Sequence, residues 1–232
     1  MPIFDGAFAR TLHIIKNNPR KGASKMKIIP IIYARSVLPE CMVFYGGSRE
    51  RTVPINFTVY YIETAKKRIL VDAGCDTMPG FEMWDFIGPV KALADAGIDK
   101  DDITDVVLTH AHHDHIEGVK HFGHAVIHIQ GDEYEIGKGY IPKGFSVNKF
   151  DEGLDLCEGV RVLKIGGHSK GSCIVEIEDG DKKYVICGDE CYVRRCLDEK
   201  IPTGASVSRE ISREFVEKYS SSEYIALLCH DE

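Results

Sequence analysis

The stretch Thr109-His110-Ala111-His112-His113-Asp114-His115 holds four imidazoles and one carboxylate within six residues, and three of the imidazoles stand with the carboxylate in the order His-x-His-x-Asp-His. Neutral imidazole and carboxylate are the ligands that a cation such as Zn²⁺ prefers in proteins. Clustered imidazoles without a cation repel one another when they are protonated, and each needs its own buried partner. The stretch therefore predicts a metal site, and the remaining imidazole, that of His113, is expected to point away from it.

The residues on either side indicate where this stretch lies in the fold. Residues 104–109 have the pattern of a short buried strand, and residues 116–119 can begin a helix. The end of a strand followed by a helix is a usual place for a site in an α/β protein. Because side chains alternate along a strand, His110 and His112 are expected on one side, with Asp114 and His115 aimed at a second point nearby.

Other polar side chains stand at or just after the end of a predicted strand. They are Asp72, His168, Asp189 and His230. Side chains at successive strand ends converge on one edge of a sheet, so the sequence predicts a single site for two metal ions. Asp72 can either cap its own turn or accept a hydrogen bond from a metal-bound histidine.

The rest of the chain alternates predicted strands with a few helices. The predicted strands lie at residues 27–33, 54–62, 68–74, 124–129, 160–164, 173–177, 183–187 and 225–229, and the helices at residues 89–96 and 208–219. Two segments rich in aromatic and apolar residues, 75–89 and 131–150, are candidates for the lining of a pocket, and packing against the core explains the first of them equally well.

Composition favours a single folded domain. The chain has 232 residues, of which 44% are hydrophobic and 28% charged, and no Pro/Gly/Ser-rich linker divides it. We expect the domain to cover residues 26–232. Residues 1–25 form a basic N-terminal extension, interpreted as a small docked helix or a frayed end, with a targeting or membrane-surface role as the alternative. The formal net charge of -7 argues against a nucleic-acid surface.

The cysteines indicate a reducing compartment. There are eight of them, none in a Cys-x-x-Cys pair, and the chain shows neither the apolar core of a signal peptide nor a run long enough for a membrane helix. Free thiols and a cytoplasmic location are therefore predicted.

Five short motifs, in order along the chain, resemble those of the metallo-β-lactamase-fold hydrolases. They are Leu70-Val71-Asp72-Ala73-Gly74, Leu108-Thr109-His110-Ala111-His112-His113-Asp114-His115, Gly167-His168-Ser169-Lys170-Gly171-Ser172, Gly188-Asp189 and Cys229-His230-Asp231. The match begins at about Met26 and runs to the C-terminal residues. The resemblance implies an α/β fold, a four-layer αββα sandwich with the site at one edge of its two sheets.

The same resemblance implies a role for each matching residue. His110, His112 and His168 would bind one metal, Asp114, His115 and His230 would bind the second, and Asp189 would bridge the two. The expected cofactors are two divalent ions, with Zn²⁺ first and Fe or Mn as alternatives. The flavodiiron branch of the superfamily has Glu where this chain has His112, which favours a hydrolytic, zinc-type site over oxygen reduction.

Within the superfamily, Asp189-Glu190-Cys191-Tyr192 and Glu133-Tyr134-Glu135 resemble segments of the N-acyl homoserine lactonases, which implies quorum quenching as a possible role. The implied reaction is attack of a bridging hydroxide on a lactone or ester carbonyl. Asp114 would hold the nucleophile and pass its proton to the leaving alkoxide, and the Tyr192 hydroxyl would donate to the oxyanion. The alternative for Tyr192 is a packed aromatic side chain without a catalytic role.

Other functions remain open from the sequence. They are a thioesterase of the glyoxalase II kind, a phosphodiesterase, a mononuclear iron dioxygenase acting on a persulfide, and a metal-binding module without catalysis. The expected partner is a small-molecule lactone or ester, with no nucleic acid and no membrane, and the chain is expected to be a monomer or a homodimer.

Overall fold

Two β-sheets make up the centre of the computed structural model, which describes residues 26–78 and 80–232. The predicted N-terminal extension, residues 1–25, lies outside the described residues. The first sheet has the order β1 (Lys27–Pro39), β2 (Thr52–Glu63), β3 (Arg68–Val71), β4 (Asp105–Leu108), β5 (Val126–Gln130) and β6 (Ser146–Phe150). The second has the order β11 (Tyr224–Leu227), β10 (Lys182–Ile186), β9 (Cys173–Asp179), β8 (Val160–Lys164) and β7 (Gly153–Cys157).

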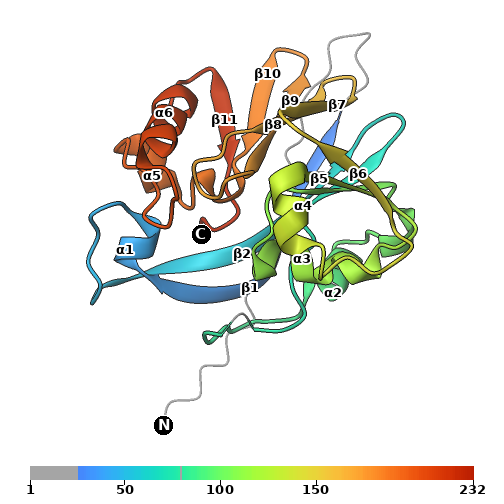
Figure 1. Cartoon of the computed structure of the whole chain (residues 1–232), viewed down its shortest axis with the longest axis horizontal. Helices are drawn as coiled ribbons and strands as arrows, with labels where there is room; N and C mark the ends of the chain where they lie inside the picture. The colour runs from blue at the N-terminus through green and yellow to red at the C-terminus, as the bar shows by residue number, and fades with distance from the viewer. Residues whose placement is uncertain (1–25, 79) are drawn as a thin grey trace.

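Short helices lie outside the two sheets. The α-helices are α1 (Glu40–Val43), α2 (Pro89–Asp95), α3 (His113–Ile116), α4 (Gly131–Gly137), α5 (Arg194–Asp198) and α6 (Arg209–Tyr219), and the 3₁₀ turns are η1 (Lys100–Asp102), η2 (Glu117–His121) and η3 (Gly188–Glu190). Figure 1 shows α5 and α6 (red) on one side of the molecule and α2, α3 and α4 (green) on the other, with the strands between them. The predicted α/β sandwich of the metallo-β-lactamase type is confirmed.

The side chains of the strands explain this layered arrangement. One hydrophobic cluster takes residues from both sheets, including Ile69 and Val71 of β3 together with Tyr184 and Ile186 of β10, and so fills the space between them. The alternate residue Leu70 belongs to the other cluster, which also holds the apolar side chains of the helices. A strand that is buried on both faces has a continuous run of apolar residues in its sequence, and β3 and β4 show this pattern after their first residue.

The direction of the strands brings the motif loops together. Strands β3, β4 and β5 are parallel, so the loops after β3 and β4 leave the sheet at the same edge. In the second sheet β11 runs parallel to β10, and the loops after both strands reach that edge as well. Backbone hydrogen bonds join the sheets there, since Cys173 N donates to Thr109 O at 2.8 Å and Thr58 N donates to Cys229 O at 3.0 Å.

Several elements differ from the sequence prediction. Strand β1 continues to Pro39 rather than ending at residue 33, because it pairs with β2 along its whole length across a bulge between Ile32 and Ala34. Strands β6 and β7 were not predicted, and residues 113–116 form α3, so Asp114 and His115 stand on a helix. All eight cysteines are free thiols, as predicted. Among the described residues, no helix has the length and apolar character needed to cross a bilayer.

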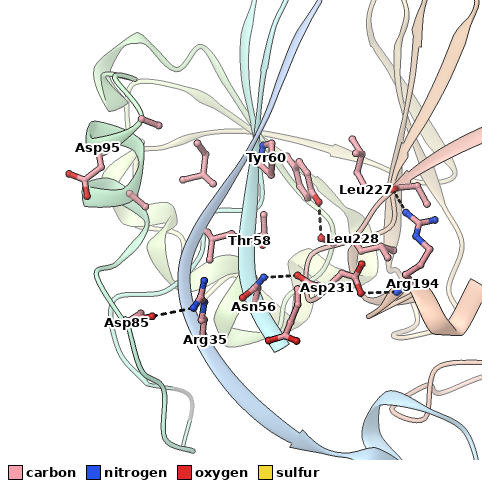
Figure 2. A pocket seen from close by; sticks show the side chains of 17 residues that line it. Arg35, Asn56, Thr58, Tyr60, Asp85, Asp95, Arg194, Leu227, Leu228 and Asp231 are labelled. Atoms are coloured by element: carbon pink, nitrogen blue, oxygen red, sulfur yellow. Dashed lines mark hydrogen bonds and ion pairs between the residues drawn. The ribbon is translucent and has the colours of Figure 1, made fainter. Parts of the chain in front are cut away.

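A groove of about 580 Å³ opens where β1, β2 and the residues after β11 meet. Figure 2 shows its polar contacts: Arg35 with Asp85, the Asn56 amide with the Asp231 carbonyl, and the Tyr60 hydroxyl with the Leu228 carbonyl. None of the seven predicted metal ligands lines it. The predicted pocket segments 75–89 and 131–150 contribute only Asp85 to this groove.

Candidate metal centre

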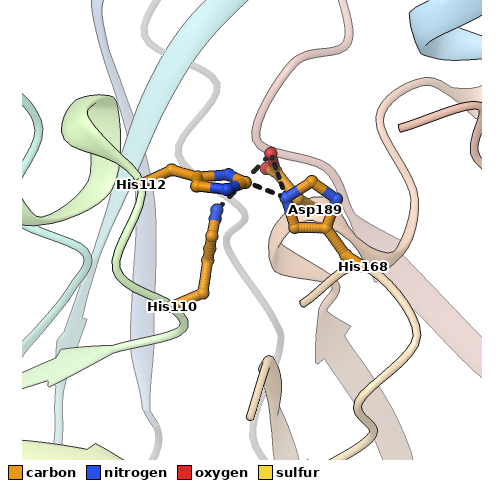
Figure 3. Close-up of side chains that lie close together, drawn as sticks. All are labelled: His110, His112, His168 and Asp189. Atoms are coloured by element: carbon orange, nitrogen blue, oxygen red, sulfur yellow. Dashed lines mark hydrogen bonds and ion pairs between the residues drawn. The ribbon is translucent and has the colours of Figure 1, made fainter. Parts of the chain in front are cut away.

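Four of the predicted ligands meet between the two sheets. His110 and His112 follow β4, His168 stands in the loop between β8 and β9, and Asp189 lies in η3 after β10 (Figure 3). Each offers one ligand atom, and these atoms all lie within 4.8 Å of one another. His112 Nδ1 is 2.9 Å from His168 Nε2, and Asp189 Oδ2 is 3.6 Å and 3.4 Å from the Nε2 atoms of His110 and His168.

These separations suit a single cation. Four ligand atoms at tetrahedral corners, each about 2.0–2.1 Å from a zinc ion, are about 3.3 Å apart. The observed separations of 2.9–3.6 Å lie on either side of that value. We call this group of four the first position.

Three further predicted ligands form a second position beside the first. Asp114 and His115 come from α3, and His230 follows β11. His115 Nε2 and His230 Nε2 are each 3.1 Å from Asp189 Oδ1, and they are 3.5 Å and 3.9 Å from Asp114 Oδ2. The two oxygens of Asp189 therefore face different groups, Oδ2 the first position and Oδ1 the second.

Burial and charge give these side chains their protonation states. Burial holds the pKa of His110 well below its ordinary value and lowers that of His168 to about 4. Burial alone would also lower the pKa of His115, but Asp189, Asp72 and Asp114 outweigh it and raise that pKa. Burial alone would raise the pKa of Asp189, but the surrounding imidazoles hold it well below its usual range. The first position thus combines the neutral imidazoles of His110 and His168 with an ionised Asp189, whereas the carboxylates around His115 favour a positive charge on that ring.

Two buried atoms test whether a cation fits. His110 Nε2 and His115 Nε2 have no hydrogen-bond partner although both are buried. A buried imidazole nitrogen without a partner is costly, whereas a lone pair directed at a cation needs no other partner. The donor set, imidazole and carboxylate without any cysteine, also suits zinc, iron or manganese. The residues present fit a pair of divalent ions.

Contacts behind the imidazoles fix which nitrogen faces the centre. The Nδ1–H of His115 donates to Asp72 Oδ2 at 2.8 Å, and the Nδ1–H of His230 donates to the Asn56 carbonyl at 2.9 Å. Asp72 also accepts from the backbone N–H and the hydroxyl of Thr109 at 2.8 Å and 2.9 Å. It does so with a left-handed backbone, φ 62°, which a residue other than glycine rarely adopts. Of the two interpretations of Asp72, the hydrogen bond to a candidate ligand is the one found.

His113 takes the expected direction, and Tyr192 lies beside the centre. His113 turns away from the centre, with Nε2 2.9 Å from the Thr77 carbonyl. The ring of Tyr192 is buried between the two positions, its centroid 4.9 Å from that of His230 and 5.9 Å from that of His168. Burial and the carboxylates of Asp189 and Asp114 hold the pKa of its hydroxyl well above the usual value, so this group stays protonated and can donate.

Sequence reasoning missed two buried carboxyl groups near the first position. Glu133 of α4 accepts hydrogen bonds from Ala111 N and Gly171 N, and Glu190 accepts from Gly167 N and His168 N. Burial raises the pKa of Glu190 to about 7. Only their positions in the sequence could have indicated these two residues. Glu190 follows Asp189, and Glu133 lies in one of the segments that resemble the lactonases.

Comparison with known proteins extends this description. Over 129 residues the chain is 26% identical to a probable metallo-hydrolase of Methanocaldococcus jannaschii, covering 56% of this chain and 57% of that protein. Over 180 residues it is 24% identical to the N-acyl homoserine lactonase AiiB of Agrobacterium fabrum, covering 61% and 65%. The chain therefore spans about three fifths of the length of these relatives.

A solved structure of a quorum-quenching N-acyl homoserine lactone lactonase superposes with a TM-score of 0.78 and 22% identity, covering 90% of this chain and 93% of that one. That likeness shows a shared fold. The family model described as the metallo-beta-lactamase superfamily matches residues 58–224, which include six of the seven predicted ligands. With this match over most of its length, the chain belongs to the metallo-beta-lactamase superfamily.

Proposed function

We propose that this chain is a metal-dependent hydrolase that uses two divalent ions to open a lactone or a related ester. The observation that carries the proposal is the position of Asp189, whose two carboxylate oxygens face two separate groups of candidate ligands. A carboxylate with this arrangement serves two ions at once, and a pair of ions is a recurring device for hydrolysis. Membership of the superfamily and the sequence likeness to a lactonase support the same reaction.

The proposed ligands follow from the two groups. His110, His112 and His168 hold the first ion, and Asp114, His115 and His230 hold the second, with Asp189 bridging. We propose zinc as the metal, with iron or manganese as alternatives, because imidazole and carboxylate ligands accept all three. Ions bound there would lower the pKa of a water molecule and polarise the scissile carbonyl.

The residues of the chain itself supply the remaining chemistry. Asp114 is the less buried of the two proposed carboxylate ligands, with a side chain 17% exposed against 3% for Asp189. Its carboxylate can accept the proton of the attacking water and return it to the leaving alkoxide. The Tyr192 hydroxyl, protonated and next to both positions, can donate a hydrogen bond to the oxyanion.

The two-metal assignment is tested by metal analysis. Wild-type protein reconstituted with Zn²⁺ and then freed of excess metal should hold about two ions per chain. Asp189→Asn should lose both together, because the bridging carboxylate serves each of them. One ion per chain in the wild type, or two tightly held ions in Asp189→Asn, would contradict the assignment.

The reaction class is tested with a substrate panel assayed in parallel. We expect the protein to hydrolyse N-acyl homoserine lactones faster than a thioester such as an S-acylglutathione, and faster than a phosphodiester. Oxygen uptake with a persulfide and the iron-loaded protein tests the dioxygenase alternative. Activity on the thioester, the phosphodiester or the persulfide alone would replace the lactonase function with that one, and no activity on any of them would favour a binding module.

A further inference from the structure

The first position is assembled from three loops that belong to different sheets. Residues 109–112 follow β4 of the first sheet, whereas residues 166–172 and 187–189 flank β9 and β10 of the second. Hydrogen bonds within one sheet therefore cannot fix where His168 stands relative to His110 and His112. Ligands of a metal need placement to within a few tenths of an ångström, so other contacts must set the distance between these loops.

Glu133 connects the loop of His110 and His112 to the loop of His168. Its Oε2 accepts from Ala111 N at 2.8 Å, and Ala111 lies between the two candidate ligands. Its Oε1 accepts from the Ser169 hydroxyl at 2.7 Å and from Gly171 N at 2.9 Å. The side chain comes from a fourth element, α4, and the residue is 1% exposed. One buried carboxylate thus spans two loops that carry three of the four ligands.

Glu190 makes the corresponding connection between the loops of His168 and Asp189. Its Oε1 accepts from Gly167 N at 3.1 Å and from His168 N at 3.2 Å, and it also accepts from the Ser172 hydroxyl. Its own carbonyl accepts from the Thr203 hydroxyl at 2.8 Å, which fixes the backbone next to Asp189. His168 is thus bonded to Glu190 through its backbone N–H, His110 and His112 flank the residue that donates to Glu133, and Asp189 precedes Glu190 in the chain.

The glycines of the His168 loop are explained by the same contacts. A Cβ atom added to Gly167 would lie 2.4 Å from Glu190 Oε2. A Cβ atom added to Gly171 would lie 2.1 Å from Gln130 Oε1 and 3.0 Å from Glu133 Cγ. The backbone lies against the Glu190 carboxyl at Gly167 and against the Gln130 amide and Glu133 Cγ at Gly171, so any side chain there would displace these groups.

The second position is supported in another way. His115 donates to Asp72 and His230 donates to the Asn56 carbonyl, and neither contact involves Glu133 or Glu190. We propose that Glu133 and Glu190 are positioning residues that assemble the first metal position, and that Glu133, which contacts no loop carrying Asp114, His115, His230 or Asp189, leaves the second position largely independent. This inference rests on the proposed two-metal ligand set.

Glu133→Gln is the sharpest test, because glutamine keeps the size of the side chain. Glutamine has only one acceptor oxygen, so its amide N–H₂ would face a backbone N–H, that of either Ala111 or Gly171. Two donors cannot bond to each other, so the hydrogen bond to one of the two loops is lost. We expect zinc affinity at the first position to fall about 10- to 100-fold, the usual effect of losing a partner behind a metal ligand, while the second changes by less than about twofold. Zinc titration measures both steps, which are assigned with His168→Ala and His230→Ala.

Glu135→Gln is the matched control, since Glu135 stands on the same helix but is exposed and forms a surface ion pair with Lys138. It should bind both ions as the wild type does. A milder variant, Ser169→Ala, removes one hydrogen bond to Glu133. It tests the same connection even if Glu133→Gln does not fold. Because the Ser169 hydroxyl acts through Glu133, Ser169→Ala should weaken the first position in the wild type but have little further effect in the Glu133→Gln background.

The outcomes separate this inference from the proposed function. A wild-type protein with fewer than two zinc sites contradicts the two-metal function itself and the inference with it. With two sites in the wild type, equal weakening of both positions in Glu133→Gln, unchanged affinities, or additive effects of Ser169→Ala and Glu133→Gln would overturn the positioning role alone. A selective loss at the first position, absent from Glu135→Gln, supports it.

Discussion

Tyr192 is the side chain that, in the proposed function, acts on the substrate without binding metal. Its ring packs against His230 and His168, one from each position, at centroid distances of 4.9 Å and 5.9 Å. The raised pKa of its hydroxyl keeps the proton in place at neutral pH. A protonated phenol held rigidly beside a site of developing negative charge needs little reorganisation to donate.

Tyr192→Phe should lower kcat for lactone hydrolysis about 10- to 1000-fold, the upper end being the loss of one oxyanion donor. KM should change less than kcat, because the hydrogen bond forms mainly in the transition state. Steady-state kinetics on wild type and variant, each checked for zinc content, measure both constants. A variant with the wild-type rate would leave Tyr192 as a packed aromatic residue only.

At this scale, the sequence predicted the ligands but not the groups that hold them. His110, His112 and Asp114 stand in one short motif, so their residue types and spacing alone indicate a metal. Glu133 and Glu190 are two among 36 acidic residues. Their role depends on burial and on backbone N–H groups from distant loops, and no local pattern records either.

At the scale of elements, the first sheet has a second polar cluster at the end of β4 opposite the metal centre. Asp105 Oδ1 accepts from Lys67 Nζ at 2.6 Å and from His128 Nε2 of β5 at 2.8 Å, and Asp105 Oδ2 accepts from the Thr104 hydroxyl at 2.7 Å. Asn148 of β6 contacts the other nitrogen of His128 at 3.0 Å. The cluster therefore ties β4, β5 and β6 to the residue before β3.

Lys67→Met should reduce the free energy of unfolding by about 1–2 kcal/mol at pH 7. Burial alone would raise the pKa of Asp105, but its hydrogen bonds with Lys67, Thr104 and His128 outweigh burial and lower it. A carboxyl with a lowered pKa in the folded state stabilises it above the unfolded value of about 4, and that contribution is lost as pH falls through the folded pKa. The difference between wild type and variant should therefore shrink below about pH 4.

Denaturant unfolding of the metal-free protein between pH 7 and pH 3 measures this difference without a contribution from metal release. Lys91→Met is the control, because Lys91 pairs with Asp95 on the surface, where both side chains are at least 41% exposed. It should cost less than about 1 kcal/mol. A Lys67→Met difference that stays constant at every pH would show that Asp105 gains nothing from the ion pair.

The elements themselves were predicted best where their pattern is apolar. Strand β8 was predicted with its observed bounds, and α6 begins one residue later than predicted because Ser208 is its N-cap and accepts from Ile211 N. Strands β6 and β7 were missed, since each has several exposed or half-buried residues and forms an edge of its sheet. A strand at an edge carries a weak pattern, and only pairing with a neighbour identifies it.

At the scale of the whole molecule, the candidate ligands join two sheets that otherwise meet mainly through apolar contacts. His110 and His115 belong to loops of the first sheet, and His168, Asp189 and His230 to loops of the second. Ions bound by both sides stabilise the folded chain only, because the unfolded chain has no assembled site.

Removal of metal should therefore lower Tm by about 10 °C, since one site held at 1000 times its Kd contributes about 4 kcal/mol and a chain of this size shifts by about 2–4 °C per kcal/mol. Thermal scans with excess Zn²⁺ and with a chelator give the difference. The chelator should have little effect on Asp189→Asn, which holds neither ion in the proposed scheme. Equal Tm values for loaded and chelated wild type would exclude a structural contribution from metal.

The order of the ligands along the chain has a consequence for biosynthesis. The four side chains of the first position have all emerged from the ribosome once Asp189 has, whereas the second position waits for His230. The 41 residues from Asp189 to His230 take about 2–8 s to translate at 5–20 residues per second. During that interval the proposed first position is complete and the proposed second one is not, so in this scheme the nascent chain could bind one ion before β11 pairs with β10. In the proposed scheme an ion at the first position would link the two sheets before the second position is complete.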